Sequence, residues 1–145
     1  MSNRIIIRDI EPAAMKAMVG LENYLATTAI TPIQQEMIRI RASQINGCAY
    51  CIDKHTRDAS KAGEDERRIY ALNAWRETPF FTEEEKAILA ITEAVTLITG
   101  GVPDAVYQQA VTVLGEQKLA QVIMAATIIN AWNRIGISTK MQPAL

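Results

Sequence analysis

The sequence has neither an excess of charge nor a long uninterrupted apolar run. Fifteen Lys and Arg side chains are balanced by 16 Asp and Glu side chains, which leaves a formal net charge of −1. Such a balance offers no basic surface for a phosphate backbone. The longest strongly apolar stretch, residues 119–137, is interrupted by Gln121, Asn130, Asn133 and Arg134. We therefore expect neither nucleic acid nor a membrane among the partners of this protein.

Cysteine and histidine are scarce, and they are concentrated. The chain has two cysteines and one histidine in 145 residues, and all three lie in residues 46–55, NGCAYCIDKH. The first 20 residues lack the basic-then-apolar pattern of a secretory signal, so we expect a cytoplasmic protein. In a reducing cytosol, a close pair of cysteines is more often catalytic or metal-binding than a structural disulfide.

Apolar residues make up 49% of the chain, which is enough for a single domain over residues 1–145 with a real core. Apolar side chains recur at helical rather than alternating spacing, so the sequence predicts an all-α bundle of six or seven helices. Residues 4–7, RIII, are the one stretch that suits an extended segment. The expected helices cover residues 11–25, 32–46, 48–63, 64–75, 82–98, 104–115 and 116–135.

Local signals set several of these boundaries. Thr31-Pro32 reads as an N-cap followed by proline at the first helical position, and Asn46-Gly47 tolerates the left-handed backbone that ends a helix. Thr82 and Glu85 have the spacing of a capping box. The last helix is apolar around most of its circumference, so we expect it in the centre of the bundle or in a subunit interface.

The two cysteines and the histidine share one face of the expected helix 48–63. At about 100° per residue, Cys48 and Cys51 lie about 60° apart, and His55 lies about 40° from Cys51. Two cysteines at this spacing in a first helical turn can close a disulfide. The helix N-terminus stabilises a thiolate, and His55 is a base within reach of Cys51.

Three interpretations of these residues remain open. They are two buried cysteines beside a core histidine, a metal site of Cys48, Cys51 and His55 completed by a carboxylate or water, and a redox-active dithiol. A c-type haem is excluded because Ile52, not histidine, follows the second cysteine. A thioredoxin-like unit requires a preceding strand, whereas residues 32–45 have a helical pattern. Redox chemistry therefore requires a different fold.

Residues 36–55, EMIRIRASQINGCAYCIDKH, resemble the core motif of AhpD-like alkylhydroperoxidases within the carboxymuconolactone decarboxylase superfamily. That motif has a glutamate twelve residues before C-x-x-C and a histidine four residues after the second cysteine. The matching residues are Glu36, Cys48, Cys51 and His55. The resemblance implies an AhpD-like all-α bundle that assembles into trimers or hexamers. Without this resemblance, the sequence would indicate that Glu36 is a solvated helix position.

The resemblance also implies a thiol-dependent peroxidase without metal or bound cofactor. Cys51 would attack the peroxide, Cys48 would then form the disulfide, and Glu36 with His55 would relay protons. An external dithiol, a lipoyl-bearing protein in better-known members, would reduce the disulfide. Tyr50 stands where those peroxidases have a second histidine, so the relay is shorter here. The alternatives are a non-catalytic oligomeric redox sensor, a disulfide reductase, and a Cys/His metal-binding module.

Overall fold

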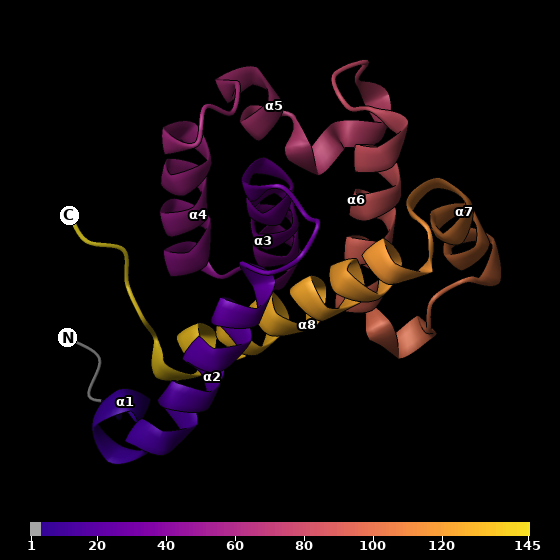
Figure 1. Cartoon of the computed structure of the whole chain (residues 1–145). Coiled ribbons are helices and arrows are strands. Elements are labelled where there is room, and N and C mark those ends of the chain that lie inside the picture. Colours follow the sequence, from indigo (N-terminus) through magenta and orange to yellow (C-terminus); the bar gives the residue numbers. More distant parts are fainter. Residues whose placement is uncertain (1–3) are drawn as a thin grey trace.

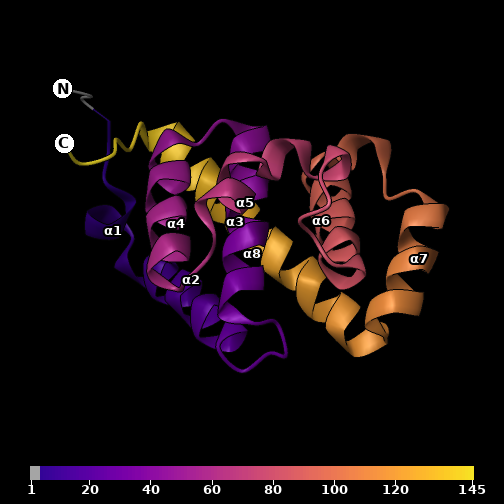
Figure 2. The same cartoon turned by 90° about the horizontal axis from the view of Figure 1, so that it is seen from above.

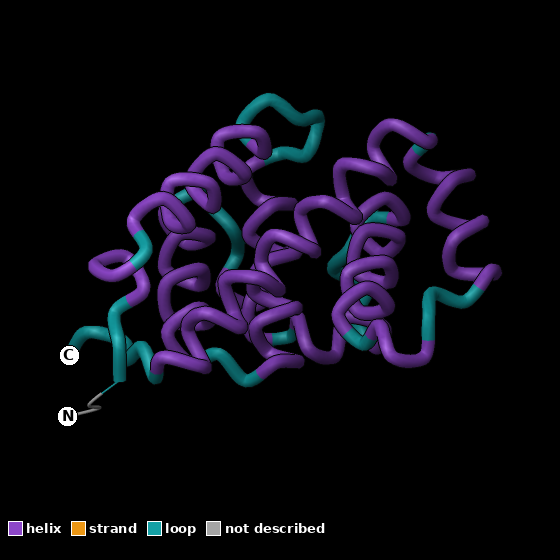
Figure 3. The backbone as a smooth tube through the Cα atoms, turned by 90° about the horizontal axis from the view of Figure 1, so that it is seen from below, coloured by secondary structure: helices purple, strands orange, loops and turns teal. Residues whose placement is uncertain are grey.

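The computed structural model describes residues 4–145. Residues 1–3, which belong to the 20-residue segment searched for a secretory signal, lie outside the described residues. Every regular element in the described residues is helical, as Figure 3 shows, and the all-α prediction is confirmed. The elements are α1 (Ile7–Ile10), α2 (Pro12–Leu25), α3 (Pro32–Asn46), α4 (Ala49–Lys61), α5 (Glu66–Tyr70), the 3-10 helix η1 (Leu72–Glu77), α6 (Glu83–Thr96), the 3-10 helix η2 (Ile98–Gly100), α7 (Asp104–Leu114) and α8 (Glu116–Thr139).

The helix boundaries that local chemistry predicts are confirmed. The Thr31 hydroxyl accepts a hydrogen bond from the Gln34 N–H, and the Gln34 side chain accepts one from the Thr31 N–H. Thr82 and Glu85 form the same reciprocal pair at the start of α6. Gly47 ends α3 in the left-handed conformation, with φ of 72°.

Four elements differ from the prediction. The expected helix 82–98 ends at Thr96, and Ile98 begins the separate 3-10 helix η2. The expected helix 64–75 is split into α5 and η1, with Ala74 in a non-helical conformation. Because the helix is not continuous, Ile69 of α5 and Trp75 of η1 can both be buried in the same core. Helix α8 continues to Thr139, beyond the expected end at residue 135. Ile7, expected in an extended segment, begins the short helix α1, while Ile6 before it has extended backbone.

Helix α8 lies in the centre of the bundle, across α3 and α6, as Figures 1 and 2 show from two sides. Helix α4 lies beyond α3 at one end, and α7 lies beyond α6 at the other. Leu119, Val122, Ala126 and Ile129 of α8 pack into the larger core. Much of the apolar surface of α8 is therefore buried within its own chain, whereas Met124 and Ile137 remain exposed. None of the helices in residues 4–145 is long and apolar enough to cross a membrane.

Helix α3 contributes to both hydrophobic cores. Ile38 and Ala42 belong to the core shared with α6, α7 and α8, whereas Met37 and Ile40 belong to the core that also holds Trp75. Fully burying a side chain such as Ile38 stabilises the fold by about 1.5–3 kcal/mol. Two packed faces fix the rotation of α3 about its axis, and with it the direction in which its polar residues point.

Candidate active site

Cys48 and Cys51 form a disulfide at the N-terminus of α4. Cys48 is the N-cap residue, Cys51 lies in the first turn, and their Cα atoms are 5.3 Å apart. Both side chains are almost completely buried. The N–H groups of Gly47 and Cys48 both donate to the Ser43 carbonyl oxygen, at 2.9 and 3.0 Å. The left-handed turn at Gly47 therefore sets where the sulfur atoms lie.

Gly136 of α8 provides the space for these sulfur atoms. A Cβ atom at this position would lie 3.3 Å from Cys48 Sγ and 3.8 Å from Cys51 Sγ. The first of these distances is shorter than about nine in ten real Cβ contacts, so a side chain here would require the sulfur atom to shift by a few tenths of an ångström. The central helix thus passes directly behind the disulfide, and glycine allows this close approach without such a shift.

A buried polar cluster holds the joint between α3 and α4 against α8. The Asn46 amide donates to the side-chain oxygens of Asn130 and Asn133, both at 2.9 Å. The Asn133 amide in turn donates to the Ser43 hydroxyl at 2.9 Å. Ser43 and Asn133 are fully buried, so the bonds replace water that these groups have lost. Ser43 and Asn46 therefore have a structural role in placing the disulfide.

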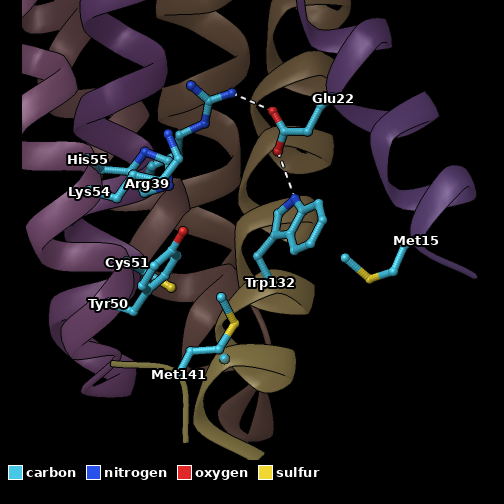
Figure 4. Close-up of a pocket in the computed structure, with 10 residues that line it drawn as sticks. Met15, Glu22, Arg39, Tyr50, Cys51, Lys54, His55, Trp132 and Met141 are labelled. Carbon is cyan, nitrogen blue, oxygen red and sulfur yellow. Dashed lines mark hydrogen bonds and ion pairs between the residues drawn. The ribbon is translucent and has the colours of Figure 1, made fainter. Parts of the chain in front are cut away.

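Cys51 opens onto a cavity of about 430 Å³ between α2, α3, α4, α8 and the C-terminal segment, shown in Figure 4. Cys48 does not line this cavity. The lining residues are Met15, Glu22, Arg39, Tyr50, Cys51, Lys54, His55, Trp132, Gly136 and Met141. The cavity thus offers an organic molecule access to Cys51 rather than to Cys48.

His55 lines the same cavity and is paired with Glu36. His55 Nδ1 lies 2.8 Å from Glu36 Oε2, and both side chains are largely buried. Glu36 is only 8% exposed, so its interpretation as a solvated helix position is wrong. The second ring nitrogen, Nε2, has no hydrogen-bond partner within residues 4–145. It is therefore the His55 atom available to accept or donate a proton in the cavity.

Three further residues join this pair, and the sequence did not place them in the site. Arg39 donates to Glu36 Oε1 and, at 2.6 Å, to Glu22 Oε2. The Trp132 indole N–H donates to Glu22 Oε1 at 2.9 Å, and Figure 4 shows these last two contacts as dashed lines. Arg39 has a signal in the sequence, since it lies three residues after Glu36 on one helix. Glu22 and Trp132 belong to distant helices, and no local pattern links them.

The group with metal-binding geometry differs from the expected one. Ligand atoms of Glu36, His55 and Asp58 lie within 4.8 Å of one another, whereas Cys48 and Cys51 are bonded to each other. The carboxylates of this group already have cationic partners. Burial alone would raise the pKa of Asp58, but the hydrogen bond and charge of Lys54 outweigh it and lower that pKa. Glu36 uses both oxygens for Arg39 and His55. These donors fit a metal poorly.

Comparisons with known proteins extend the likeness from the motif to the whole chain. A model of the carboxymuconolactone decarboxylase family matches residues 12–94. The uncharacterized protein YdfG of Bacillus subtilis is 44% identical over 139 residues, which cover 95% of each chain. A structure from Agrobacterium tumefaciens has a TM-score of 0.92 at 34% identity over 98% of each chain, and its description suggests the antioxidant defence protein AhpD. The debrominase Bmp8 has a TM-score of 0.85 at 19% identity, over 94% of this chain and 74% of its own, so this likeness concerns the fold alone.

Proposed function

Since the chain belongs to the carboxymuconolactone decarboxylase family, within which it has an AhpD-like fold, we propose that it is a thiol-dependent peroxidase. One observation carries the proposal. Cys51, half of a redox-competent cysteine pair, lines the same cavity as His55, whose Nδ1 is held 2.8 Å from Glu36. The paired cysteines favour redox chemistry over decarboxylation, which has no use for a disulfide.

The reduced enzyme would begin with Cys51 as a thiolate. Its sulfur attacks the terminal oxygen of a hydroperoxide, the O–O bond breaks, and the products are a Cys51 sulfenic acid and an alcohol, or water from hydrogen peroxide. His55 Nε2 first takes the thiol proton and then supplies a proton to the leaving oxygen. Position favours Cys51 for this step, because it lines the cavity and lies four residues before His55.

The second step would close the disulfide. The Cys48 sulfur attacks the Cys51 sulfenic acid, and the sulfenic oxygen leaves as water. An external dithiol, such as a lipoyl group, then returns two electrons and two protons by thiol–disulfide exchange. We expect it to attack Cys51 first, because Cys48 lies outside the cavity lining. A reducing cytoplasm is the compartment that maintains such a reductant.

A homo-oligomer, a trimer or a hexamer, is part of the same proposal. Ile5, Ile6, Ile10 and Val19, in and around α1 and α2, are each at least 50% exposed. Figure 1 shows these two helices extending from the main bundle. Apolar side chains gathered on such an arm favour contact with another copy. Light scattering on the purified protein should give a mass three or six times that of the chain, and a monomeric mass at micromolar concentration would contradict this.

The decisive experiment is stopped-flow oxidation of the reduced, metal-free protein by hydrogen peroxide and by cumene hydroperoxide. We expect oxidation much faster than that of a simple dithiol, with a final mass lower by two hydrogens. Cys51→Ser should abolish the reaction. Cys48→Ser should stop after one turnover with one oxygen atom gained, because the sulfenic acid has no partner.

The competing functions predict different results. A redox sensor oxidises no faster than a free thiol and changes its assembly state with oxidation. A disulfide reductase is slow with peroxide but fast with small disulfides. A metal-binding module retains zinc when it is purified under reducing conditions, and the metal protects its thiols from alkylation. Normal peroxide turnover by Cys51→Ser would remove the peroxidase assignment altogether.

A further inference from the structure

One wall of the cavity is a continuous hydrogen-bonded chain that crosses four helices. It runs from His55 on α4 to Glu36 and Arg39 on α3, then to Glu22 on α2, and ends at Trp132 on α8. All members except Glu36 line the cavity that Cys51 shares. The cavity wall is therefore built by residues that hold one another, rather than by independent side chains.

Glu36 can act on His55 only if its carboxylate is held in one orientation. A carboxylate on a side chain with three rotatable bonds has no fixed direction unless its oxygens are bound. Glu36 Oε2 contacts His55 Nδ1, and its other oxygen is bound only by Arg39 within residues 4–145. The side chains of Glu36 and Arg39 are largely buried, with 10% and 15% of their side-chain surface exposed, so water does not replace Arg39 without cost.

Arg39 is itself fixed by the far end of the chain. Its planar guanidinium donates from Nη1 to Glu36 and from Nη2 to Glu22, so the two carboxylates are set relative to each other. Glu22 is less buried, with 30% of its side chain exposed, and the Trp132 indole N–H secures its second oxygen. Trp132 therefore anchors the arrangement to the central helix, beside the sulfur atoms.

We propose that Arg39, secured by Glu22 and Trp132, is a positioning residue that aligns Glu36 so that His55 keeps its proton on Nδ1 and presents a bare Nε2 to the cavity. Its kinetic consequence rests on the proposed peroxidase function, whereas its effect on the His55 tautomer does not. Free histidine favours the opposite tautomer, with the proton on Nε2, so the tautomer reports whether Glu36 is aligned.

The presence of a single histidine allows a direct test. The protein is labelled with ¹⁵N-histidine, and the two ring nitrogens are followed by NMR as the pH is raised until the signals stop changing. We expect the wild type to show a protonated Nδ1 and a bare Nε2. In Arg39→Met the signals should move toward the free-histidine pattern, and in Trp132→Phe they should move in the same direction by less.

Arg41→Met is the matched control. Arg41 lies on the same helix, its side chain has the same 15% exposure as that of Arg39, and it donates to Glu93 at 2.8 Å away from the cavity. Both variants lose one buried arginine, so both should lose stability. Only Arg39→Met should change the His55 tautomer. If the tautomer is unchanged in a folded Arg39→Met or Trp132→Phe protein, the proposal is wrong.

Kinetics give the second readout. Peroxide oxidation of reduced Arg39→Met should be about tenfold slower per folded molecule than that of the wild type, a loss of the size seen when a group that orients a metal-ligating histidine is mutated. Arg39→Lys should recover part of the rate, because an ammonium can bind one of the two carboxylates. Slow oxidation of the wild type itself would instead count against the peroxidase function, while the tautomer would still decide the positioning role.

Discussion

At the scale of single residues, Gly136 is the position where the smallest change has the clearest effect. An added methyl group lies 3.3 Å from Cys48 Sγ, so Gly136→Ala must displace the disulfide or the helix. Overpacking of this kind costs about 1–3 kcal/mol, which opposes the gain of up to about 1 kcal/mol from replacing a helical glycine. Urea unfolding of the oxidised protein should show a net loss of stability.

Gly20 is the matched control for Gly136. It also lies within a helix, but a Cβ atom there meets nothing within 4 Å in the described part of the chain. Gly20→Ala should therefore raise the free energy of unfolding by about 0.5–1 kcal/mol. Equal effects of the two substitutions would show that the space behind the disulfide is not tight.

Glu36 illustrates what a single residue in a sequence can and cannot reveal. Periodicity alone assigned it to a solvated face, and only the resemblance of its spacing to a known motif associated it with His55. The structure places it in a buried ion pair because α3 packs on two cores at once and has no solvated side at that position. Glu22 and Trp132 have no such motif, so their contact was not predictable.

At the scale of elements, the joint between α3 and α4 determines the geometry of the site. Gly47 has φ of 72°, and no atom of residues 4–145 lies within 4 Å of an added Cβ, so the cost of a side chain there is that of the left-handed backbone. Gly47→Ala should lower the free energy of unfolding by about 1–2 kcal/mol, and Gly47→Asn by less. Thermal unfolding of both variants tests this order. An alanine variant as stable as the wild type would contradict it.

Helix ends were predictable because their chemistry is local. Thr31 with Gln34, and Thr82 with Glu85, cap their helices within four residues of sequence. The break between α5 and η1 was not predictable, since it serves contacts made far away. Trp75, within η1, donates to Glu93 of α6 at 2.9 Å, and Arg68, within α5, binds Glu85 at 2.7 Å. Tertiary contacts here override a continuous helical pattern.

At the scale of the whole molecule, buried carboxylates make stability depend on pH. Burial alone would raise the pKa of Glu93, but hydrogen bonds from Arg76, Arg41 and Trp75 outweigh it and lower that pKa below the usual 4.5. Arg68 and the Thr82 backbone do the same for the pKa of Glu85. A lowered pKa means that the folded state binds protons less readily, so this stabilisation is complete above about pH 4.5 and is lost below it.

Glu93→Gln should therefore lower the free energy of unfolding near neutral pH by about 3 kcal/mol, because it leaves buried arginine without its partner. The difference from the wild type should shrink as the pH falls below 4.5, the usual glutamate pKa. Glu83→Gln is the control, since that side chain is 76% exposed and, among residues 4–145, pairs only with Lys86. Urea unfolding across this pH range should distinguish Glu93→Gln from Glu83→Gln. If the free energy of unfolding of Glu93→Gln falls with decreasing pH in parallel with that of the wild type, Glu93 is not a source of the pH dependence.

Met141 belongs to the segment after α8, lines the cavity, and is held by a backbone hydrogen bond from its N–H to the Gly136 carbonyl at 2.9 Å. The last four residues therefore leave the molecule directly beside the opening to Cys51. An affinity tag or fluorescent fusion at that end would compete for the same entrance with the hydroperoxide and the dithiol of the proposed reaction. Kinetic constants for this protein should be compared only after such an extension has been removed.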